Sequence, residues 1–247
     1  MNQQIVILAA GKGTRMGGEI PKVLLPLYDQ PVISHLLREI KDVAQLTTPV
    51  IVVGYKEDLV KETLGKEYIY VTQFDQKGTG HAVLSSKEAI TADNFIVLYG
   101  DMPFTSKKSL EDLIGLHTHH HAKISMFTCT VPNFDEDQYQ PFLGYGRIIR
   151  NEAGNIEKIV EYKDCTEEQK HILEVNPGIY MFNSNWVWNE LDQIGHNNAQ
   201  DEFYLTDVVE IAIRDGQTIY SLSIDAKEVY GINTPEHLAY ARTLTHS

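Results

Sequence analysis

The 247-residue chain has only two cysteines, Cys129 and Cys165, which are too few for a disulfide framework and lack the spacing of a zinc site. It has no run near the roughly 18 apolar residues that a membrane span needs. Its first apolar run, Ile5–Ala10, lacks the basic segment that precedes the core of a signal peptide. We therefore expect a soluble protein of the reducing cytoplasm with no membrane partner.

Basic charge is also scarce. The chain has 21 Lys and Arg against 34 Asp and Glu, which leaves a formal net charge of −13 at pH 7. Because a nucleic acid or an anionic lipid surface binds basic patches, neither is an expected partner. In contrast, 43% of the residues are hydrophobic, which is enough to bury a substantial core. The length fits one large domain or two small ones.

Short apolar runs alternate with amphipathic segments over residues 1–122. The apolar runs are typical of buried strands, and we expect these at Gln4–Ala9, Val50–Gly54 and Phe95–Tyr99. Amphipathic helices are expected to begin at Pro31 and to cover approximately Glu57–Leu64, His81–Ile90 and Ser106–His117. This alternation predicts a mainly parallel sheet with helices on both faces, in which ligands bind at the carboxyl ends of the strands.

After Lys123 the pattern changes, because apolar strands follow one another with few helices between them. We expect strands at Ile124–Val131, Gly146–Arg150, Asn155–Tyr162 and Glu174–Phe182. Helices are expected at Asn185–Ile194, at Thr206–Arg214 and from the cap sequence Thr234-Pro235-Glu236 onward. This half is therefore predicted to be antiparallel or mixed.

A glycine-rich loop follows the first expected strand. Its sequence, LAAGKGTRM over Leu8–Met16, lets backbone N–H groups approach a phosphate closely. It is neither a GxGxxG dinucleotide motif nor a P-loop, because Met16 and Glu19 stand where those motifs require Gly and Lys. The loop and the residues after it contain three cations: Lys12, Arg15 and Lys22. This local positive charge suits a polyphosphate ligand, with an ordinary turn and solvated side chains as the alternative.

Asp101 follows the third expected strand and should lie at the ligand-binding edge of the sheet. A single carboxylate near a phosphate loop suits Mg²⁺, which usually takes only one or two protein oxygens. A cap on the helix that begins near Ser106 explains the same side chain equally well. Gln73, which precedes the turn at Gly78 and Thr79, offers an amide that can contact a nucleobase edge, although turn chemistry alone would explain the glycines.

A series of short motifs occurs in the order seen in one enzyme family. After LAAGKGTRM they are PKVL, GTGHA, YGD, GYGRI, VEYKD, NPGIY and NNAQDEFYLTD. The chain resembles the uridylyltransferase domain of the bacterial family that makes UDP-N-acetylglucosamine from UTP and N-acetylglucosamine 1-phosphate. The resemblance extends from Ile5 to about Asn233, and the motifs after the first make it specific.

The resemblance implies a set of site residues. The implied nucleotide-binding residues are Leu8, Ala9, Ala10, Gly11, Gly13, Gln73, Gly78 and Thr79. The implied sugar-phosphate-binding residues are Tyr99, Gly100, Gly146, Glu161 and Asn176. Arg15 and Lys22 would be catalytic cations that neutralise the triphosphate. Asp101 and Asn233 would bind Mg²⁺.

The fold implied by the resemblance is a Rossmann-like, GT-A-like nucleotidyltransferase fold of the α/β class. It has a mixed, mainly parallel sheet flanked by helices, and a smaller β-rich lobe for the sugar. Residues 1–247 would form a single domain, of which residues 1–122 bind mainly the nucleotide and residues 123–230 mainly the sugar. Residues 231–247 would supply a metal-ligand loop and the C-terminal helix.

The chain departs from the family pattern at three places. It ends soon after Asn233, before the left-handed β-helix that carries the acetyltransferase of bifunctional members. We therefore expect neither acetyltransferase activity nor the trimer that the β-helix builds, although another oligomer is possible. The segment Asn133–Leu143, which leads into GYGRI, is longer than usual, and Pro177 replaces a threonine after Asn176. These changes leave the identity of the sugar open.

The predicted reaction is a Mg²⁺-dependent transfer of the uridylyl group of UTP to a sugar 1-phosphate, with N-acetylglucosamine 1-phosphate as the first candidate. The alternatives are another sugar 1-phosphate, a CTP-dependent polyol-phosphate cytidylyltransferase, and a catalytically silent nucleotide-sugar sensor. A glycosyltransferase is a less favoured alternative. Arg15 and Lys22 suit a reaction in which pyrophosphate leaves, and a glycosyltransferase has no evident need of such cations. Asp135 and Asp137 match the DxD metal pattern of such enzymes, but their polar surroundings predict a solvated charge run.

Overall fold

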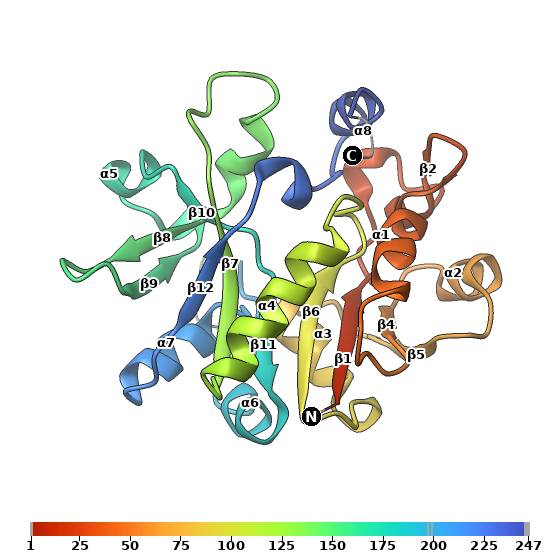
Figure 1. Cartoon of the computed structure of the whole chain (residues 1–247). Coiled ribbons are helices and arrows are strands. Elements are labelled where there is room, and N and C mark those ends of the chain that lie inside the picture. The colour runs from red at the N-terminus through yellow and green to blue at the C-terminus, as the bar shows by residue number, and fades with distance from the viewer. Residues whose placement is uncertain (1, 197, 199, 245–247) are drawn as a thin grey trace.

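A ten-stranded sheet forms the centre of the computed structural model, which describes residues 2–196, 198 and 200–244 (Figure 1). The strands follow the order β5-β4-β1-β6-β11-β7-β10-β8-β9, and β12 also pairs with β7. Their bounds are β1 (Gln3–Leu8), β4 (Val50–Val53), β5 (Ile69–Thr72), β6 (Asn94–Tyr99), β7 (Ile124–Thr130), β8 (Gly146–Arg150), β9 (Ile156–Val160), β10 (Glu174–Asn176), β11 (Tyr180–Asn183) and β12 (Tyr220–Ser223). A separate hairpin consists of β2 (Pro26–Leu27) and β3 (Gln30–Pro31).

The first half of the sheet is parallel, as the alternation of strands and helices predicts. β1 pairs with β4 and β6, and β4 pairs with β5, all in parallel. All of β4 is buried, and so are β1 and β6 except for their last residues, as expected for strands that are covered on both faces. The expected strands agree with β1, β4 and β6 to within one residue at each end. The short edge strand β5 was not among the expected strands.

The second half of the sheet is mixed, which confirms the expectation from sequence. β11 is antiparallel to β6 and β7, and β10 is antiparallel to β7 and β8. β8 and β9 form an antiparallel pair, whereas β12 runs parallel to β7. Figure 1 shows β8 and β9 on the opposite side of the molecule from β4 and β5.

The expected single strand Glu174–Phe182 is wrong, because the structure divides it into β10 and β11. Pro177 has no N–H to donate to a strand ladder, and Gly178 adopts a φ of +81°. Oδ1 of Asn176 accepts a hydrogen bond from the backbone N of Gly178 at 2.9 Å, which closes the turn. The chain therefore changes its partners in the sheet immediately after Asn176.

Helices cover both faces of the sheet. One face is covered by α1 (Val32–Lys41), α2 (Glu57–Leu64), α4 (Lys107–His119) and α8 (Pro235–Ala241), which share one apolar core. The other face is covered by α3 (Thr79–Ser85), α6 (Ser184–Leu191) and α7 (Asp207–Arg214), which share a second core. A further short helix, α5 (Glu167–Lys170), precedes β10, and the 3-10 turns are η1 (Thr14–Met16), η2 (Lys22–Leu24), η3 (Lys87–Ala89), η4 (Gln140–Gly144), η5 (Tyr162–Asp164) and η6 (Ala226–Val229).

The helix boundaries agree with the sequence only in part. The helix expected at His81–Ile90 begins earlier, at the start of α3, and the 3-10 turn η3 replaces its second half. The cap expected at Thr234 is confirmed, since its Oγ1 accepts a hydrogen bond from the backbone N of His237 at 3.3 Å, with Pro235 in the first helical position. Among the described residues, no helix is both long and apolar enough to cross a membrane.

The last helix returns the chain to the hairpin that follows β1 (Figure 1). Arg242 Nη2 donates a hydrogen bond to Pro26 O at 2.8 Å, and Tyr28 OH donates one to Ala241 O at 3.2 Å. Just before α8, the backbone N of Ile232 donates to the carbonyl oxygen of Asp101 at 2.9 Å. These contacts fix the segment around Asn233 against the carboxyl end of β6.

Candidate functional site

The glycine-rich loop leaves the carboxyl end of β1 and is held by its neighbours. The carbonyl oxygen of Ala10 accepts a hydrogen bond from Gln76 Nε2 at 3.2 Å. Gly13 is left-handed, with φ +59°, and a Cβ added there would lie 2.9 Å from Cβ of Lys22. Gly11 is exposed, and a Cβ added there would meet no described atom within 4 Å. The loop is therefore open at Gly11 and closely packed at Gly13.

The ends of β1 and β6 meet beside this loop. The backbone N of Gly100 donates to Leu8 O at 3.0 Å, and that of Ala9 donates to β4 at 2.8 Å. A Cβ added at Gly100 would lie 3.1 Å from Cγ1 of Val23. The glycine therefore lets the turn η2, which carries Lys22, pack against the sheet.

Gln73 follows β5 and is only 4% exposed. Its Nε2 donates to Gly78 O at 3.2 Å and lies 3.1 Å from Nδ1 of His81. A Cβ added at Gly78 would lie 2.6 Å from the carbonyl oxygen of Phe203, and Thr79 Oγ1 accepts a hydrogen bond from the same segment at 3.2 Å. The segment before α7 thus packs directly on this glycine turn.

A cavity of about 390 Å³ opens at the carboxyl end of the parallel strands. It brings together the predicted residues Arg15, Lys22, Thr79, Tyr99, Asp101, Gly146, Glu161, Asn176 and Asn233. In the described part of the chain, the predicted residues outside its lining are Leu8, Ala9, Ala10, Gly11, Gly13, Gln73, Gly78 and Gly100. A larger cavity, of about 720 Å³, lies between α1 and the segments before β4 and β5, and no described residue of the predicted site lines it.

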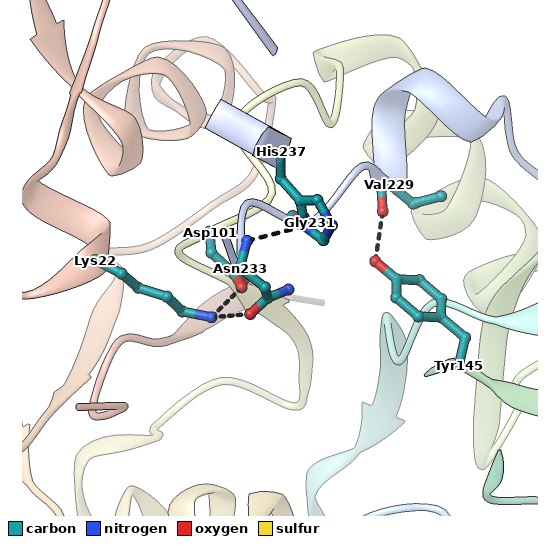
Figure 2. Close-up of polar contacts among 7 residues, drawn as sticks. All are labelled: Lys22, Asp101, Tyr145, Val229, Gly231, Asn233 and His237. Carbon is teal, nitrogen blue, oxygen red and sulfur yellow. Dashed lines mark hydrogen bonds and ion pairs between the residues drawn. The ribbon is translucent and has the colours of Figure 1, made fainter. Parts of the chain in front are cut away.

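One end of the smaller cavity, here called the cation end, consists of Arg15, Lys22, Asp101 and Asn233. Figure 2 shows Nζ of Lys22 bound to both residues that were expected to hold the metal. It donates to Oδ2 of Asp101 and, at 2.6 Å, to Oδ1 of Asn233. The side chains of Lys22 and Asp101 are only 19% and 9% exposed, so this ion pair is largely shielded from solvent.

The backbone around Asn233 is fixed by His237 in the first turn of α8 (Figure 2). Nδ1 of His237 accepts a hydrogen bond from the backbone N of Asn233 at 3.3 Å and lies 3.2 Å from the carbonyl oxygen of Gly231. Burial lowers the pKa of His237, and the nearby charges of Arg15 and Lys22 act in the same direction. Tyr145 OH donates to a carbonyl oxygen of the preceding turn η6, at 2.9 Å.

A second group of lining residues, here called the carboxylate end, consists of Glu161, Asn176, Glu202 and Thr206. Thr206 Oγ1 donates a hydrogen bond to Glu161 Oε1 at 3.1 Å. Asn176 Nδ2 donates to the buried Tyr180 OH at 2.7 Å. These side chains offer carboxylate, amide and hydroxyl groups, the types that recognise the hydroxyls of a sugar.

The carboxylates at this end lie in a partly dehydrated environment. Burial raises the pKa of Glu161, and the charge of Glu202 raises it further, although the hydrogen bond from Thr206 lowers it. Burial also raises the pKa of Asp207 to about 6, with a further contribution from Glu210. Within the described residues neither Glu161 nor Glu202 forms an ion pair, which sets this end apart from the cation end.

The donor set at the cation end fits a divalent cation that binds through few protein oxygens. One carboxylate oxygen of Asp101 and one amide oxygen of Asn233 point to the same place, which Nζ of Lys22 fills. Mg²⁺ usually takes one or two protein oxygens and keeps its other positions for water and phosphate. Among the described residues, no group of three or more His, Cys, Asp or Glu side chains could hold a metal ion. Asp101 and Asn233 therefore remain a candidate metal site with two protein ligands.

No residue of the longer segment Asn133–Leu143 belongs to the described lining of the cavity, whereas the next residue, Gly144, does. Tyr240 OH of α8 donates to Gln138 Oε1 at 3.2 Å, and the buried ring of Phe142 packs edge-on against Tyr230. The segment therefore connects the second half of the sheet to the C-terminal helix. Its acidic run, which includes the DxD match at Asp135, is exposed, as expected.

Sequence reasoning missed part of the cavity lining. The additional lining residues are Met102, Gly144, Tyr145, Pro177, Gly178, Tyr180, Gln200, Glu202, Tyr204, Leu205 and Thr206. Most of them belong to the motifs GYGRI, NPGIY and NNAQDEFYLTD, which were recognised as strings but not assigned side chain by side chain. Two residues of the last motif, Asn197 and Ala199, lie outside the described residues.

Comparisons with known proteins show the family to which the chain belongs. Residues 5–171 match the family described as MobA-like NTP transferase domain. Over 246 residues the chain is 37% identical to the bifunctional protein GlmU of Exiguobacterium sibiricum, and the match covers 98% of this chain and 53% of that protein. The chain thus spans about half the length of this curated relative.

Two solved structures share the fold. A UDP-glucose pyrophosphorylase complexed with UDP-glucose matches with a TM-score of 0.78 at 19% identity, covering 98% of both chains. A CMP:2-keto-3-deoxy-manno-octonic acid synthetase complexed with CTP matches with a TM-score of 0.71 at 17% identity, also covering 98% of both chains. These matches confirm the expected α/β fold with a mixed, mainly parallel sheet flanked by helices.

Proposed function

This chain belongs to the family of MobA-like NTP transferase domains and is a sugar nucleotidyltransferase; on that basis we propose that it transfers the uridylyl group of UTP to N-acetylglucosamine 1-phosphate. The products are the UDP-sugar and pyrophosphate. The proposal keeps the division of the chain inferred from sequence, in which residues 1–122 serve mainly the nucleotide and residues 123–230 mainly the sugar. UTP and the sugar phosphate are then the partners of the domain.

One observation carries this proposal: a single cavity joins the cation end to the carboxylate end. Phosphates of both substrates carry negative charge, which Arg15 and Lys22 can neutralise. The hydroxyls of a sugar can donate hydrogen bonds to Glu161 and Asn176. The glycine-rich loop contacts the cation end through Gly13, beside Lys22, and Gln73 contacts the glycine turn at Gly78. We assign both segments to the nucleoside part of UTP. The distribution of these groups supports a site for a nucleotide next to a sugar phosphate.

The chemistry needs alignment and charge neutralisation more than proton transfer. The second pKa of a phosphate monoester is about 6, so the phosphate oxygen of the sugar substrate is already a nucleophile at neutral pH. In the reaction this oxygen forms a bond to the α-phosphorus of UTP, while the bond from that phosphorus to the departing pyrophosphate oxygen breaks. We assign no general base and no covalent residue, because the reaction as written requires neither.

The residues of the cation end have two different roles in this reaction. Arg15 and Lys22 neutralise the charge that builds up on the phosphates during in-line attack. Asp101 and Asn233 would hold Mg²⁺, which supplies further neutralisation of phosphate charge when bound. The Asp101 side chain is only 9% exposed, so its contact with Lys22 is largely shielded from water and is electrostatically stronger for that reason.

The test is release of pyrophosphate by the purified protein with Mg²⁺, in which UTP, CTP, dTTP and GTP are each combined with several sugar 1-phosphates and with a polyol phosphate. We expect the highest rate with UTP and N-acetylglucosamine 1-phosphate. A preference for glucose 1-phosphate or for CTP with a polyol phosphate would contradict the proposed substrates. Silence with every pair, together with intact binding of UDP-sugars, would contradict catalysis and support a sensor. The variant Asp101→Asn controls for a contaminating enzyme.

A further inference from the structure

Lys22 occupies the point at which the two predicted metal ligands converge (Figure 2). Its ammonium binds Oδ2 of Asp101 and lies 2.6 Å from Oδ1 of Asn233. An ammonium and a hydrated divalent cation cannot both occupy this place, because each needs the same two oxygens and their charges repel. The lysine and the metal therefore compete for one binding site.

We propose that Lys22 is a tethered counter-ion that keeps the divalent-cation site closed until a polyphosphate draws the lysine away. The proposal rests on the assignment of Asp101 and Asn233 as metal ligands under the proposed function. It makes metal binding conditional on nucleotide binding, since the phosphates offer Lys22 a new partner and free both oxygens. Metal alone then binds weakly, and metal with nucleotide binds cooperatively.

The charge balance explains why the lysine takes this place. Asp101 is 7% exposed as a whole residue, and a carboxylate at such a position is costly to leave without a partner. Lys22 supplies the partner from within the chain. A bound triphosphate carries several negative charges against the single charge of Asp101, so it competes well for the ammonium.

The packing around Lys22 allows its side chain to move while its backbone stays in place. The turn η2 is closed by the hydrogen bonds from Leu24 N to Pro21 O at 2.8 Å and from Leu25 N to Lys22 O at 3.2 Å. Val23 is 3% exposed and packs beside Gly100, which anchors the turn to the sheet. The Lys22 side chain is 19% exposed and faces the open cavity, so a ligand can reach it.

The glycine-rich loop provides the physical link between the nucleotide and Lys22. The stem of Lys22 lies so close to Gly13 that a Cβ on the glycine would be 2.9 Å from the lysine Cβ. The proposed function places the triphosphate on this loop. Any shift of the loop on nucleotide binding would therefore displace the stem of Lys22 directly. The phosphates on this loop would at the same time offer the lysine its new partner.

The experiment measures binding of Mn²⁺ alone to the metal-free full chain, by electron paramagnetic resonance of the free ion. Mn²⁺ replaces Mg²⁺ because both prefer oxygen ligands. We expect Lys22→Met to bind Mn²⁺ at least about tenfold more tightly than the wild type, in the range typical of coupling between two sites. Lys22→Arg keeps the charge and should bind as weakly as the wild type. The tighter binding should disappear in the double variant Lys22→Met, Asp101→Asn.

Lys12→Met is the matched control, because it removes the same charge from the same segment. Lys12 is exposed, and in the described part of the chain its side chain forms no ion pair, so its removal should change Mn²⁺ affinity by no more than about twofold. If Lys22→Met binds Mn²⁺ no more tightly than Lys12→Met, the proposal that Lys22 is a tethered counter-ion is wrong. Circular dichroism of each variant verifies that the fold is retained.

The outcome is separable from that of the proposed function. Mn²⁺ binding without nucleotide does not depend on which nucleotide or sugar phosphate the protein uses, so the Lys22 result stands even if pyrophosphate release follows another substrate pair. The converse result is also informative. If pyrophosphate is released with UTP and N-acetylglucosamine 1-phosphate but Lys22→Met gains no Mn²⁺ affinity, the proposed function is supported and the counter-ion role of Lys22 is contradicted.

Discussion

The cation end and the carboxylate end of the cavity differ in how the chain builds them. At the cation end, Arg15 and Lys22 come from one short stretch after β1, and Asp101 follows the neighbouring parallel strand β6. At the carboxylate end, Glu161 follows β9, whereas Thr206 precedes α7. Apart from Asn233, which comes from the segment before α8, the cation end is thus made by the loops of adjacent parallel strands, whereas the carboxylate end is formed by separate segments of the mixed half.

The two ends also differ in how charge is compensated. Asp101 is paired with Lys22, whereas Glu161 accepts a hydrogen bond from the neutral hydroxyl of Thr206 and has a raised pKa because it is buried. Paired charges are ready to exchange partners with an anionic ligand. A buried carboxylate with a neutral partner retains acceptor capacity for hydroxyl groups. Under the proposed function, we therefore expect that phosphate recognition and sugar recognition can be perturbed separately.

Asp101→Asn should give the largest effect, because it removes the only carboxylate of the cation end. We expect kcat to fall by about 10²–10³-fold, the scale seen when one transition-state-stabilising group is lost. The assay is pyrophosphate release at saturating substrates. The control is Asp135→Asn, which removes one charge from the exposed run in the segment Asn133–Leu143 and should leave kcat unchanged. Equal loss in both variants would contradict the role of Asp101.

Gly13→Ala should weaken the cation end through the position of Lys22. Gly13 and Gly17 both have positive φ, but only the Cβ at Gly13 would meet the lysine stem, at 2.9 Å, while Gly17 has open space. Gly17→Ala is therefore the control for backbone strain. We expect kcat of Gly13→Ala to be about 10- to 100-fold lower than that of Gly17→Ala, because small misplacement of a catalytic group is costly. Equal rates would show that the contact is unimportant.

Glu161→Gln should affect the carboxylate end alone. We expect KM for the sugar 1-phosphate to rise about tenfold, the scale of one hydrogen bond to a charged group. KM for UTP should stay within about twofold, since the cation end is untouched. Glu157→Gln, at an exposed position of β9, is the control and should change neither value. A rise in KM for UTP of the same size would contradict the expectation that the two ends act separately.

Asp207→Asn should give the smallest effect, on stability. Burial raises the pKa of Asp207 to about 6 in the folded protein, above the ordinary value of 3.8. The folded state therefore binds the proton more tightly, and this group makes the free energy of unfolding increase as pH falls from about 6 to about 4. The variant should lose that pH dependence and be about 1 kcal/mol more stable at pH 7.5.

Urea unfolding at pH 7.5 and pH 5 measures this difference. Asp215→Asn, at the exposed end of α7, is the control and should keep the pH dependence of the wild type. If Asp207→Asn and Asp215→Asn behave alike, burial of Asp207 contributes no measurable stability difference. Because Asp207 adjoins Thr206 of the carboxylate end, the result also tests how strongly burial acts on the carboxyl groups in that part of the molecule.

The parallel half of the fold could be predicted closely from sequence. β1, β4 and β6 are continuous apolar runs, and such runs identify strands that are buried on both faces. The mixed half was predicted less well, because its register depends on pairing between distant segments. The break at Pro177 and Gly178 illustrates this: the apolar pattern continues through Glu174–Phe182, and the change of partners becomes visible only when β10 and β11 are placed in the sheet.

The candidate site shows the same division. The resemblance to the family motifs predicted Asp101, Asn233 and Glu161 as site residues, and the structure places all three around one cavity. It did not nominate Tyr145 or Thr206, because a motif string does not say which of its side chains face inward. Whether each nominated residue has its predicted role stays a prediction for the variants described above.

By itself, the sequence determined that buried strands alternate with amphipathic helices in the first half, because both follow from the spacing of apolar residues along a short stretch of chain. It also determined that glycines and cations lie together after β1. Only the tertiary structure decided that the ammonium of Lys22 fills the place between Asp101 and Asn233. Those partners lie 79 and 211 positions away along the chain, and no local preference specifies that such distant side chains meet. Sheet pairing and the return of α8 bring them together.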